Sequence, residues 1–407
     1  MQTQIIDAIK ATPEGQDADA ILRKCVHCGF CLATCPTYSL SGNELQSPRG
    51  RIYLIKQMLE SGQAPESTRQ HLDSCLNCRA CETTCPASVP YHRLLDIGTQ
   101  LLEEQRPRRW RERLLRRAVL TVLPYPSRFT PLLRTAQIVR PLLPGSLKNK
   151  LPRHQPASAA PRKTGVRKML LLEGCVQPGI APEINAATRR VLSHFDISLQ
   201  SARNAGCCGA ISYHLQQKDD GLNFMRRNID AWWPLVEKGF EAIVITASGC
   251  GTTIKEYGSL LKDDSQYADK AAQISYLAKD LVEILREEPL EQLKVETQGS
   301  LAFQCPCSLQ HAQKLGGTVE QLLARMGFKM MPISESYLCC GSAGTYSLFQ
   351  PELATELRNR KSAALRNSSA DHYISANIGC ISHLSSSTDK PVEHWIQIID
   401  RALQISD

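Results

Sequence analysis

The sequence CVHCGFCLATCPTY, residues 25–38, places four cysteines within eleven residues and follows the last of them with a proline. The same arrangement returns in CLNCRACETTCPAS, residues 75–88. In the C-x2-C-x2-C-x3-C-P run, three cysteines bind one iron–sulfur cluster and the fourth reaches a second cluster. One copy would leave two incomplete ligand sets, whereas two copies complete both. The duplication therefore predicts two 4Fe–4S clusters with crossed ligation.

Crossed ligation divides the eight cysteines into two sets. The first cluster is assigned to Cys25, Cys28, Cys31 and Cys85, and the second cluster is assigned to Cys75, Cys78, Cys81 and Cys35. Zinc is the weaker alternative, because zinc sites use separate C-x2-C pairs and not three cysteines in series followed by a fourth.

The segment between the two motifs is longer than in a compact bacterial ferredoxin and carries helical patterns. Apolar residues at helical spacing predict a helix around 52–59, with Gly62 as its C-cap, and the ranges 67–75 and 90–105 also read as helices. Residues 1–105 thus resemble the α-helical two-cluster ferredoxins of respiratory dehydrogenases. Arg49 and Arg51 are expected either to support a cluster or a nearby loop, or to begin a solvated helix.

Length and composition limit the class of protein to which the chain can belong. The chain has 407 residues, 42% of them apolar and 22% charged, which indicates a globular protein of about two to three domains. The first 20 residues lack the pattern of a secretory signal, and no run approaches the roughly 18 apolar residues of a transmembrane helix. Many cysteines form disulfides mainly in short secreted chains, so the 17 cysteines here are interpreted as metal ligands.

A basic bridge follows the ferredoxin region. RPRRWRERLLRR, residues 106–117, holds seven arginines and one glutamate, and basic and apolar residues continue to alternate up to residue 150. This pattern predicts a peripheral contact with anionic membrane lipids. A docking surface for a partner subunit and a solvated linker helix are the alternatives, and nucleic acid is not expected as a partner. Residues 152–166 read as an interdomain linker.

The pattern then changes to α/β. Four apolar segments, 167–175, 240–250, 300–307 and 371–380, read as buried strands that each run into a cysteine. Helices are expected between them, over 183–195, 222–237, 312–326 and 352–366. In parallel α/β sheets, ligands bind outside the carboxyl ends of the strands.

The α/β part of the chain is duplicated. AGCCGAISY, residues 205–213, matches LCCGSAGTY, residues 338–346, and the spacing of 32 residues from Cys175 to Cys207 recurs from Cys307 to Cys339. Cysteines acting only as small buried side chains would not explain this matched spacing. Each half thus supplies a candidate metal site. The first set comprises Cys175, Cys207, Cys208 and Cys250, and the second comprises Cys307, Cys339, Cys340 and Cys380. Cys305 is left without a role.

The duplicated CCG pattern resembles the cysteine-rich domains found in heterodisulfide reductases, in anaerobic glycerol-3-phosphate dehydrogenases and in lactate- and glycolate-oxidising complexes. With a two-cluster ferredoxin in front, the chain most resembles the iron–sulfur subunits of bacterial glycolate oxidases (glycolate dehydrogenases). The stretches that carry this resemblance are RACETTCPASVPYHRLLDIG (79–98), NIDAWWP (228–234), TASGCG (246–251) and CCGSAGTY (339–346).

The resemblance implies an α + α/β fold in four regions. These are the α-helical ferredoxin (1–105), the basic bridge and linker (106–166), the first CCG half-domain (167–300) and the second CCG half-domain (301–407). Heterodisulfide reductase has a fifth cysteine in each half, where this chain has Thr253 and His383. A five-cysteine cluster is therefore not expected. A four-cysteine site remains open in each half, and at least one of the two is expected to bind a cluster. An ordinary packed histidine is the expected role of His383, with ligation in the second set as the alternative.

The resemblance also implies the function. The chain would be the electron-transfer subunit of an enzyme complex that oxidises glycolate, taking electrons from FAD-containing flavoprotein subunits and passing them to a quinone-type acceptor. The alternatives are oxidation of lactate or glycerol-3-phosphate, and direct catalysis of the heterodisulfide reductase kind. The sequence has neither a G-x-G-x-x-G nucleotide fingerprint nor a Walker loop, so neither flavin nor nucleotide is expected to bind through a recognisable motif. No acid–base pair for oxidising a hydroxy acid stands out, and no catalytic residue is assigned. A cytoplasmic location on the inner face of the cytoplasmic membrane is expected.

Overall fold

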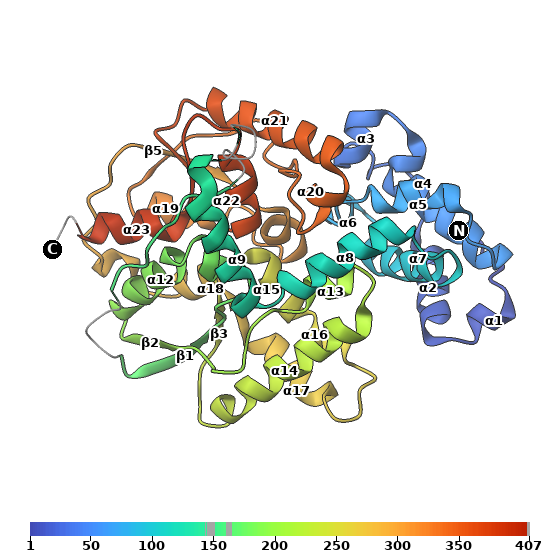
Figure 1. Ribbon diagram of the computed structural model, residues 1–407, viewed down its shortest axis with the longest axis horizontal. Helices are drawn as coiled ribbons and strands as arrows, with labels where there is room; N and C mark the ends of the chain where they lie inside the picture. Colours follow the sequence, from blue (N-terminus) through green and yellow to red (C-terminus); the bar gives the residue numbers. More distant parts are fainter. Residues whose placement is uncertain (143, 145–150, 160–164, 405–407) are drawn as a thin grey trace.

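The computed structural model describes residues 1–142, 144, 151–159 and 165–404. The expected linker over 152–166 therefore lies partly outside the described residues. The ferredoxin helices form one end of the molecule and the two CCG half-domains form the other end (Figure 1). The fold is α + α/β, as the sequence predicts.

Residues 1–105 are helical. The helices are α1 (Asp7–Lys10), α2 (Pro13–Lys24), α3 (Pro36–Ser41), α4 (Pro48–Ser61), α5 (Glu66–Asp73), α6 (Ala80–Thr84) and α7 (Tyr91–Gln105), with a 3-10 turn η1 (Glu44–Gln46). The hydroxyl of Ser47 accepts a hydrogen bond from the N–H of Gly50 and caps α4 at its start. Gly62 ends the same helix in the left-handed conformation (φ 68°), which confirms the predicted C-cap.

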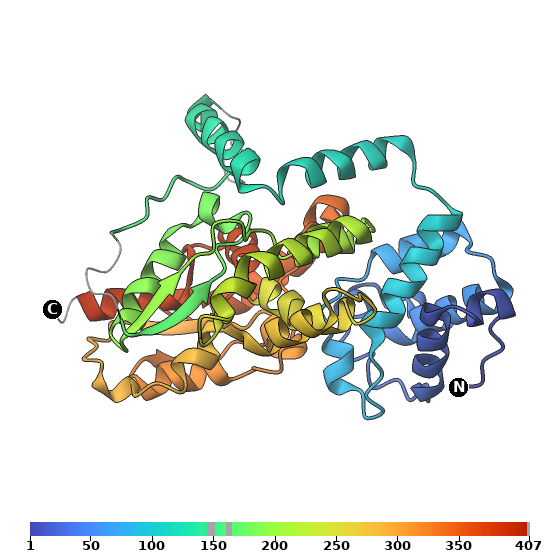
Figure 2. The same ribbon diagram turned by 90° about the horizontal axis from the view of Figure 1, so that it is seen from below.

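Two helices and a 3-10 turn are the helical elements described in the basic bridge. They are α8 (Trp110–Val122), α9 (Pro126–Val139) and η2 (Arg140–Leu142). Figure 2 shows α8 running along one face of the molecule from the ferredoxin helices toward the first half-domain. The helix α9 then projects outward in this view, and its Phe129 and Thr130 lie against Gly179 of the first half-domain. None of the helices within the described ranges is both long and apolar enough to span a membrane.

The first CCG half-domain is a parallel four-stranded sheet with helices around it. Its strands are β1 (Arg167–Leu171), β2 (Ile197–Gln200), β3 (Ile243–Ile245) and β4 (Ala278–Asp280), in the order β2-β1-β3-β4. Its helices are α11 (Gln177–Ile180), α12 (Glu183–Ser193), α13 (Ala210–His214), α14 (Lys218–Val236), α15 (Ser248–Lys255), α16 (Tyr257–Leu260), α17 (Ala268–Leu277) and α18 (Leu281–Leu285).

The second CCG half-domain repeats this topology. Its parallel strands are β5 (Ser300–Gln304), β6 (Lys329–Met330), β7 (His372–Ser375) and β8 (Val392–His394), in the order β6-β5-β7-β8. Its helices are α19 (Thr318–Arg325), α20 (Tyr346–Phe349), α21 (Pro351–Asn367), α22 (Ile378–Ser385) and α23 (Trp395–Gln404), with a 3-10 turn η3 (Leu290–Gln292) before β5 and a π-helical turn η4 (Ser308–Ala312) after it.

One predicted helix is interrupted. The sequence predicts a single helix over 312–326, but η4 ends at Ala312 and α19 begins only at Thr318. Lys314 and Gly317 between them have positive φ angles of 58° and 79°. Because consecutive helical residues need negative φ, this turn at the Gly316–Gly317 pair ends one helical segment before the next begins.

The two half-domains meet at the carboxyl ends of their strands. The N–H of Ser248, after β3, donates to the carbonyl oxygen of Ala376, after β7, at 3.1 Å. The hydroxyls of Ser248 and Ser308 also lie 2.8 Å apart. The two cysteine-bearing strand ends are therefore held face to face in the middle of the molecule.

Candidate iron–sulfur centres

The first candidate centre is a cavity of about 470 Å³ in the ferredoxin region. It is lined by the four cysteines assigned to the first cluster, Cys25, Cys28, Cys31 and Cys85. Cys28 is exposed, and its neighbours Val26 and Phe30 also expose most of their side chains. This cavity therefore opens to the protein surface beside an apolar rim.

The second candidate centre is a smaller cavity of about 310 Å³. It is lined by the other four assigned cysteines, Cys35, Cys75, Cys78 and Cys81. Cys81 also borders the first cavity, so the two cavities share part of one wall. The structure thus gathers both crossed sets, each containing one cysteine from the opposite motif, while the ligation itself stays a prediction.

The two cysteine loops repeat the same backbone conformation. His27 and Asn77, each two residues after the first cysteine of its motif, have positive φ angles of 55° and 50°. Gly29 and Arg79, two residues further along each loop, also have positive φ angles, of 85° and 60°. These turns direct the N–H groups of His27 and Asn77 toward the sulfurs of Cys25 and Cys75, where they stabilise the thiolates. Backbone donors of this kind are a common feature of iron–sulfur sites.

The chemistry of the donor sets fits clusters. Burial raises the pKa of Cys31 to about 11 and raises the pKa of Cys81 well above its ordinary value. Such thiols ionise only when a cation compensates them, and the irons of a cluster supply that charge. Within the described residues, no three His, Cys, Asp or Glu side chains are arranged to hold a single metal ion. The cysteines are instead spread around cavities, as a cluster of several irons requires.

The first CCG set lies at the strand ends of the first half-domain. Interactions with Cys207 and Cys250 hold the pKa of Cys208 well below its ordinary value. The neighbouring thiols Cys175 and Cys208 raise the pKa of Cys207. The four sulfurs therefore follow one another in the order Cys175, Cys207, Cys208 and Cys250, each next to the one before. The ring of Tyr125, at the start of α9, packs on Phe224 beside this set, with ring centroids 5.5 Å apart.

The second CCG set has the same arrangement. The sulfurs of Cys340 and Cys380 lie 3.2 Å apart, and the N–H of Gly341 donates to the sulfur of Cys339 at 3.4 Å. Interaction with Cys339 and Cys78, together with burial, raises the pKa of Cys307 well above its ordinary value. All four predicted cysteines of this set are thus brought together, and one of them also meets the ferredoxin region.

The glycine of each CCG motif permits close packing. Gly209 and Gly341 have φ angles of 91° and 86°. A Cβ atom at Gly209 would lie 2.6 Å from the carbonyl oxygen of Gly221, and one at Gly341 would lie 2.5 Å from that of Ala354. Only glycine therefore allows α14 and α21 to approach the paired cysteines in this way.

The residues at the missing fifth-cysteine positions bond within helices or to a neighbouring helix. His383 Nε2 lies 3.2 Å from the carbonyl oxygen of Ala354, and the hydroxyl of Thr253 donates to that of Gly249 at 3.3 Å. Cys305 is buried in the apolar core of the half-domains.

Sequence reasoning missed the contact between the ferredoxin region and the second half-domain. Cys78 and Cys307 pack on the same apolar cluster, which includes Leu76 and Tyr346. The phenol of Tyr346 donates to the carbonyl oxygen of Ser74 at 3.0 Å. No sequence signal pairs these segments, because they lie more than 200 residues apart and depend on the packing of separately folded elements.

Each cysteine-rich part of the chain matches a known protein family. Residues 21–89 match a family described as "4Fe-4S dicluster domain". Residues 169–255 and 301–385 each match a family described as "Cysteine-rich domain".

Whole-chain relatives extend these matches. The chain is 52% identical to "Glycolate oxidase iron-sulfur subunit" of Escherichia coli (strain K12) over 99% of its length and 100% of that protein. It is 30% identical to "Probable glycolate oxidase iron-sulfur subunit" of Bacillus subtilis (strain 168), over 88% of this chain and 87% of that one. A solved structure of a hypothetical protein from Helicobacter pylori has a similar fold, with a TM-score of 0.55 at 10% identity, over 96% of this chain and 72% of that one.

Proposed function

The chain belongs to the family of glycolate oxidase iron–sulfur subunits, and we propose that it carries single electrons from an FAD-containing flavoprotein subunit of its complex to a quinone-type acceptor. The observation that carries this proposal is the pair of cavities lined by crossed cysteine sets. When bound, the clusters supply one-electron redox chemistry, and the protein sets their position and potential. Oxidation of glycolate itself is assigned to the flavin of the partner subunit.

The residues that would hold the two ferredoxin clusters are those of the crossed sets. Cys25, Cys28, Cys31 and Cys85 would hold the first cluster, and Cys75, Cys78, Cys81 and Cys35 the second. Each CCG set of four contacting thiols would hold a further cluster. The contacts between successive sulfurs support this, because crowded thiolates repel one another unless a cation lies between them.

A peripheral position on an anionic membrane is the second part of the proposal. The exposed face of α8 carries Arg109, Arg113 and Arg117 together with Trp110, which is 69% exposed. Beyond it, α9 exposes 78% of Ile138. Basic groups alternating with exposed apolar side chains suit a surface that offers both headgroups and acyl chains.

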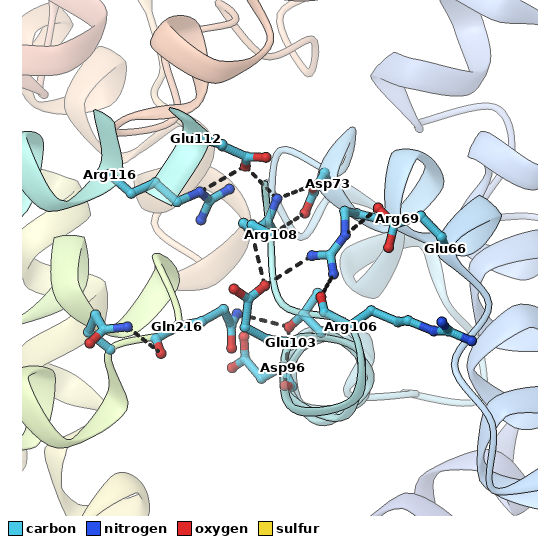
Figure 3. Close-up of polar contacts among 12 residues, drawn as sticks. Glu66, Arg69, Asp73, Asp96, Glu103, Arg106, Arg108, Glu112, Arg116 and Gln216 are labelled. Atoms are coloured by element: carbon cyan, nitrogen blue, oxygen red, sulfur yellow. Dashed lines mark hydrogen bonds and ion pairs between the residues drawn. The ribbon is translucent and has the colours of Figure 1, made fainter. Parts of the chain in front are cut away.

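Not every arginine of the bridge belongs to that face. Arg108 is buried, and its guanidinium pairs with Asp73 at 2.6 Å, Glu112 at 2.6 Å and Glu103 at 2.9 Å. Figure 3 shows Arg108 between these carboxylates, with Arg116 reaching Glu112 from the next turn of α8. Arg108 ties the start of α8 to the ferredoxin helices through Asp73 and Glu103, whereas Arg116 pairs with Glu112 within α8 and lies over the ring of Phe349. Neither arginine is part of the proposed membrane contact.

The test separates electron transfer from catalysis. The isolated chain, reconstituted anaerobically with iron and sulfide, is mixed with glycolate and an artificial electron acceptor. No turnover is expected until the flavoprotein subunit is added, and the complex should then reduce a quinone. Turnover by the isolated chain would contradict the proposal. Lactate and glycerol-3-phosphate, tested in the same complex, distinguish the alternative substrates.

A further inference from the structure

The wall of the second cavity contains a buried cation. Arg51, in the first turn of α4, lines this cavity together with Cys35 and Cys75, and only 1% of the residue is exposed. A guanidinium is protonated under all ordinary conditions. The cavity therefore carries a fixed positive charge before any cluster enters it.

Three hydrogen bonds to neutral groups hold Arg51 in place. Its Nε donates to the carbonyl oxygen of His71 at 2.6 Å, and its Nη2 donates to the hydroxyls of Thr37 and Ser74, each at 2.9 Å. These partners orient the guanidinium but do not neutralise it. In the part of the chain that the structure describes, Arg51 forms no ion pair with a carboxylate. The thiols of Cys75 and Cys35 and the phenol of Tyr91 line the same cavity and interact electrostatically with Arg51.

The first cavity has an arginine in a different electrostatic setting. Arg49 lines that cavity, but its side chain is 31% exposed and its Nε pairs with Glu44 at 2.8 Å. The carboxylate cancels most of this charge at a distance, and water screens the remainder. The two cavities thus differ in uncompensated charge, although their cysteine loops have the same conformation.

We propose that Arg51 is a charge-compensating residue that raises the reduction potential of the second cluster above that of the first. A cluster becomes more negative by one unit when it accepts an electron. A buried cation beside it stabilises the reduced form more than the oxidised form, and this stabilisation is little screened because Arg51 is buried. The inference rests on the proposed function, since it requires a cluster in each cavity. With this difference in potential, an electron shared between the two ferredoxin clusters would reside mainly on the second cluster, which adjoins the second CCG half-domain.

The experiment compares four forms of the full-length chain, each reconstituted anaerobically with iron and sulfide. These are the native chain, Arg51→Gln, Arg51→Lys and the matched control Arg49→Gln. Iron and sulfide content is measured first. The midpoint potential of each cluster is then determined by redox titration followed by electron paramagnetic resonance, with Cys28→Ser used to identify the signals of the first cluster.

Arg51→Gln should lower the equilibrium constant for reduction of the second cluster at least about tenfold, or about 59 mV for one electron. Arg51→Lys should retain a potential near the native one, and Arg49→Gln should leave the second cluster unchanged. An unchanged potential in Arg51→Gln would overturn the proposal. If Arg51→Gln loses the second cluster, Arg51→Lys decides: a retained cluster at the native potential supports the role of the charge, and its loss shows that Arg51 only ties the loops together. A native chain without two ferredoxin clusters would instead refute the proposed function itself.

Discussion

The thiol of Cys307, in the second CCG half-domain, lies against the thiol of Cys78, in the second ferredoxin motif. The second cavity and the second CCG set therefore meet without an intervening layer of protein. Among the described residues, no contact of this kind is shown for the cysteines assigned to the first cavity, which opens to the surface beside the exposed Cys28. The two ferredoxin sites therefore differ in their surroundings, although their sequences are repeats.

Crossed ligation is tested by the fourth cysteine of the first motif. Cys35→Ser should damage the second cluster and remove roughly half of the iron of the ferredoxin region, because Cys35 would belong to the set of Cys75, Cys78 and Cys81. Iron analysis and electron paramagnetic resonance measure this loss. Cys305→Ser is the control, since Cys305 lies outside both cavities and both CCG sets. Selective loss of the first cluster in Cys35→Ser would contradict crossing.

The CCG sets are tested by the second cysteine of each CCG motif. Cys208→Ala and Cys340→Ala should each lower the iron content and slow the delivery of electrons to quinone in the complex. Reduction of the flavoprotein by glycolate should remain at the native rate, because that step does not involve these thiols. Normal iron content with normal quinone reduction in both variants would show that the CCG sets hold no working cluster.

The glycine after the second cysteine pair is tested against a nearby glycine. Gly341→Ala combines a positive φ with a clash against the carbonyl oxygen of Ala354, and it should destabilise the protein by at least about 3 kcal/mol. Gly344 also has a positive φ, of 64°, but no atom lies within 4 Å of its would-be Cβ. Gly344→Ala should therefore cost only about 1 kcal/mol. Denaturant unfolding measures the loss of stability in each variant. Equal losses would contradict the clash expected between a Cβ atom at Gly341 and the carbonyl oxygen of Ala354.

The membrane contact is tested by reversing exposed charges on α8. The triple change of Arg109, Arg113 and Arg117 to glutamate should release the complex from anionic vesicles at moderate salt. Each basic residue contributes about 1 kcal/mol near such a surface, so binding should weaken by at least about 100-fold. The control is the same change at Lys238, Lys294 and Lys329, which are exposed on the half-domains. Unchanged vesicle binding by the α8 variant would indicate that the bridge contacts a partner subunit.

The buried His394, which joins the two half-domains, predicts that the protein loses stability at acidic pH. Its Nε2–H donates to the carbonyl oxygen of Thr246 at 2.9 Å, and its Nδ1 accepts from the N–H of Ile396 at 3.2 Å. A neutral ring satisfies both contacts, and burial, partly opposed by the Thr246 bond, lowers its pKa to about 4. The unfolded histidine titrates near its ordinary value, so the unfolded state gains protons first and stability is lost as the pH falls.

The size of this effect follows from the two pKa values. Between about pH 7.5 and about pH 5.5, the native protein should lose roughly 1 kcal/mol of stability through His394. Denaturant unfolding at both pH values measures the loss, and His394→Gln should remove that part of it. An equal acid loss in the variant would assign the sensitivity to other groups.

The sequence predicted the central strands of both sheets but missed the edges. The four predicted strands became β1, β3, β5 and β7, which occupy the two middle positions of each sheet. Central strands are buried on both faces and read as continuous apolar runs. The edge strands β2, β4, β6 and β8 are two to four residues long, and most carry exposed or half-buried positions. They therefore leave no comparable pattern.

In the candidate sites, too, some features could be predicted from the sequence and others only from the fold. Repeated cysteine spacing identified every sulfur that lines the cavities or joins the CCG sets. The charges that surround them were less accessible to sequence reasoning. Arg49 and Arg51 stand two residues apart, yet only the fold shows that one is paired and half-exposed and the other buried and unpaired with any described carboxylate. Lys361, buried with its Nζ 2.6 Å from the carbonyl oxygen of Glu335, is likewise placed near the second CCG set by packing alone.

The exposure of Cys28 has a practical consequence for handling the protein in air. Dioxygen and small oxidants reach sulfur by diffusion, so the centre with a ligand at the surface is the first to be attacked. Val26 and Phe30 would shield that edge only when another molecule covers them. Oxidative damage should therefore begin at the first cavity when the chain is purified alone, and an intact complex should withstand aerobic conditions for longer.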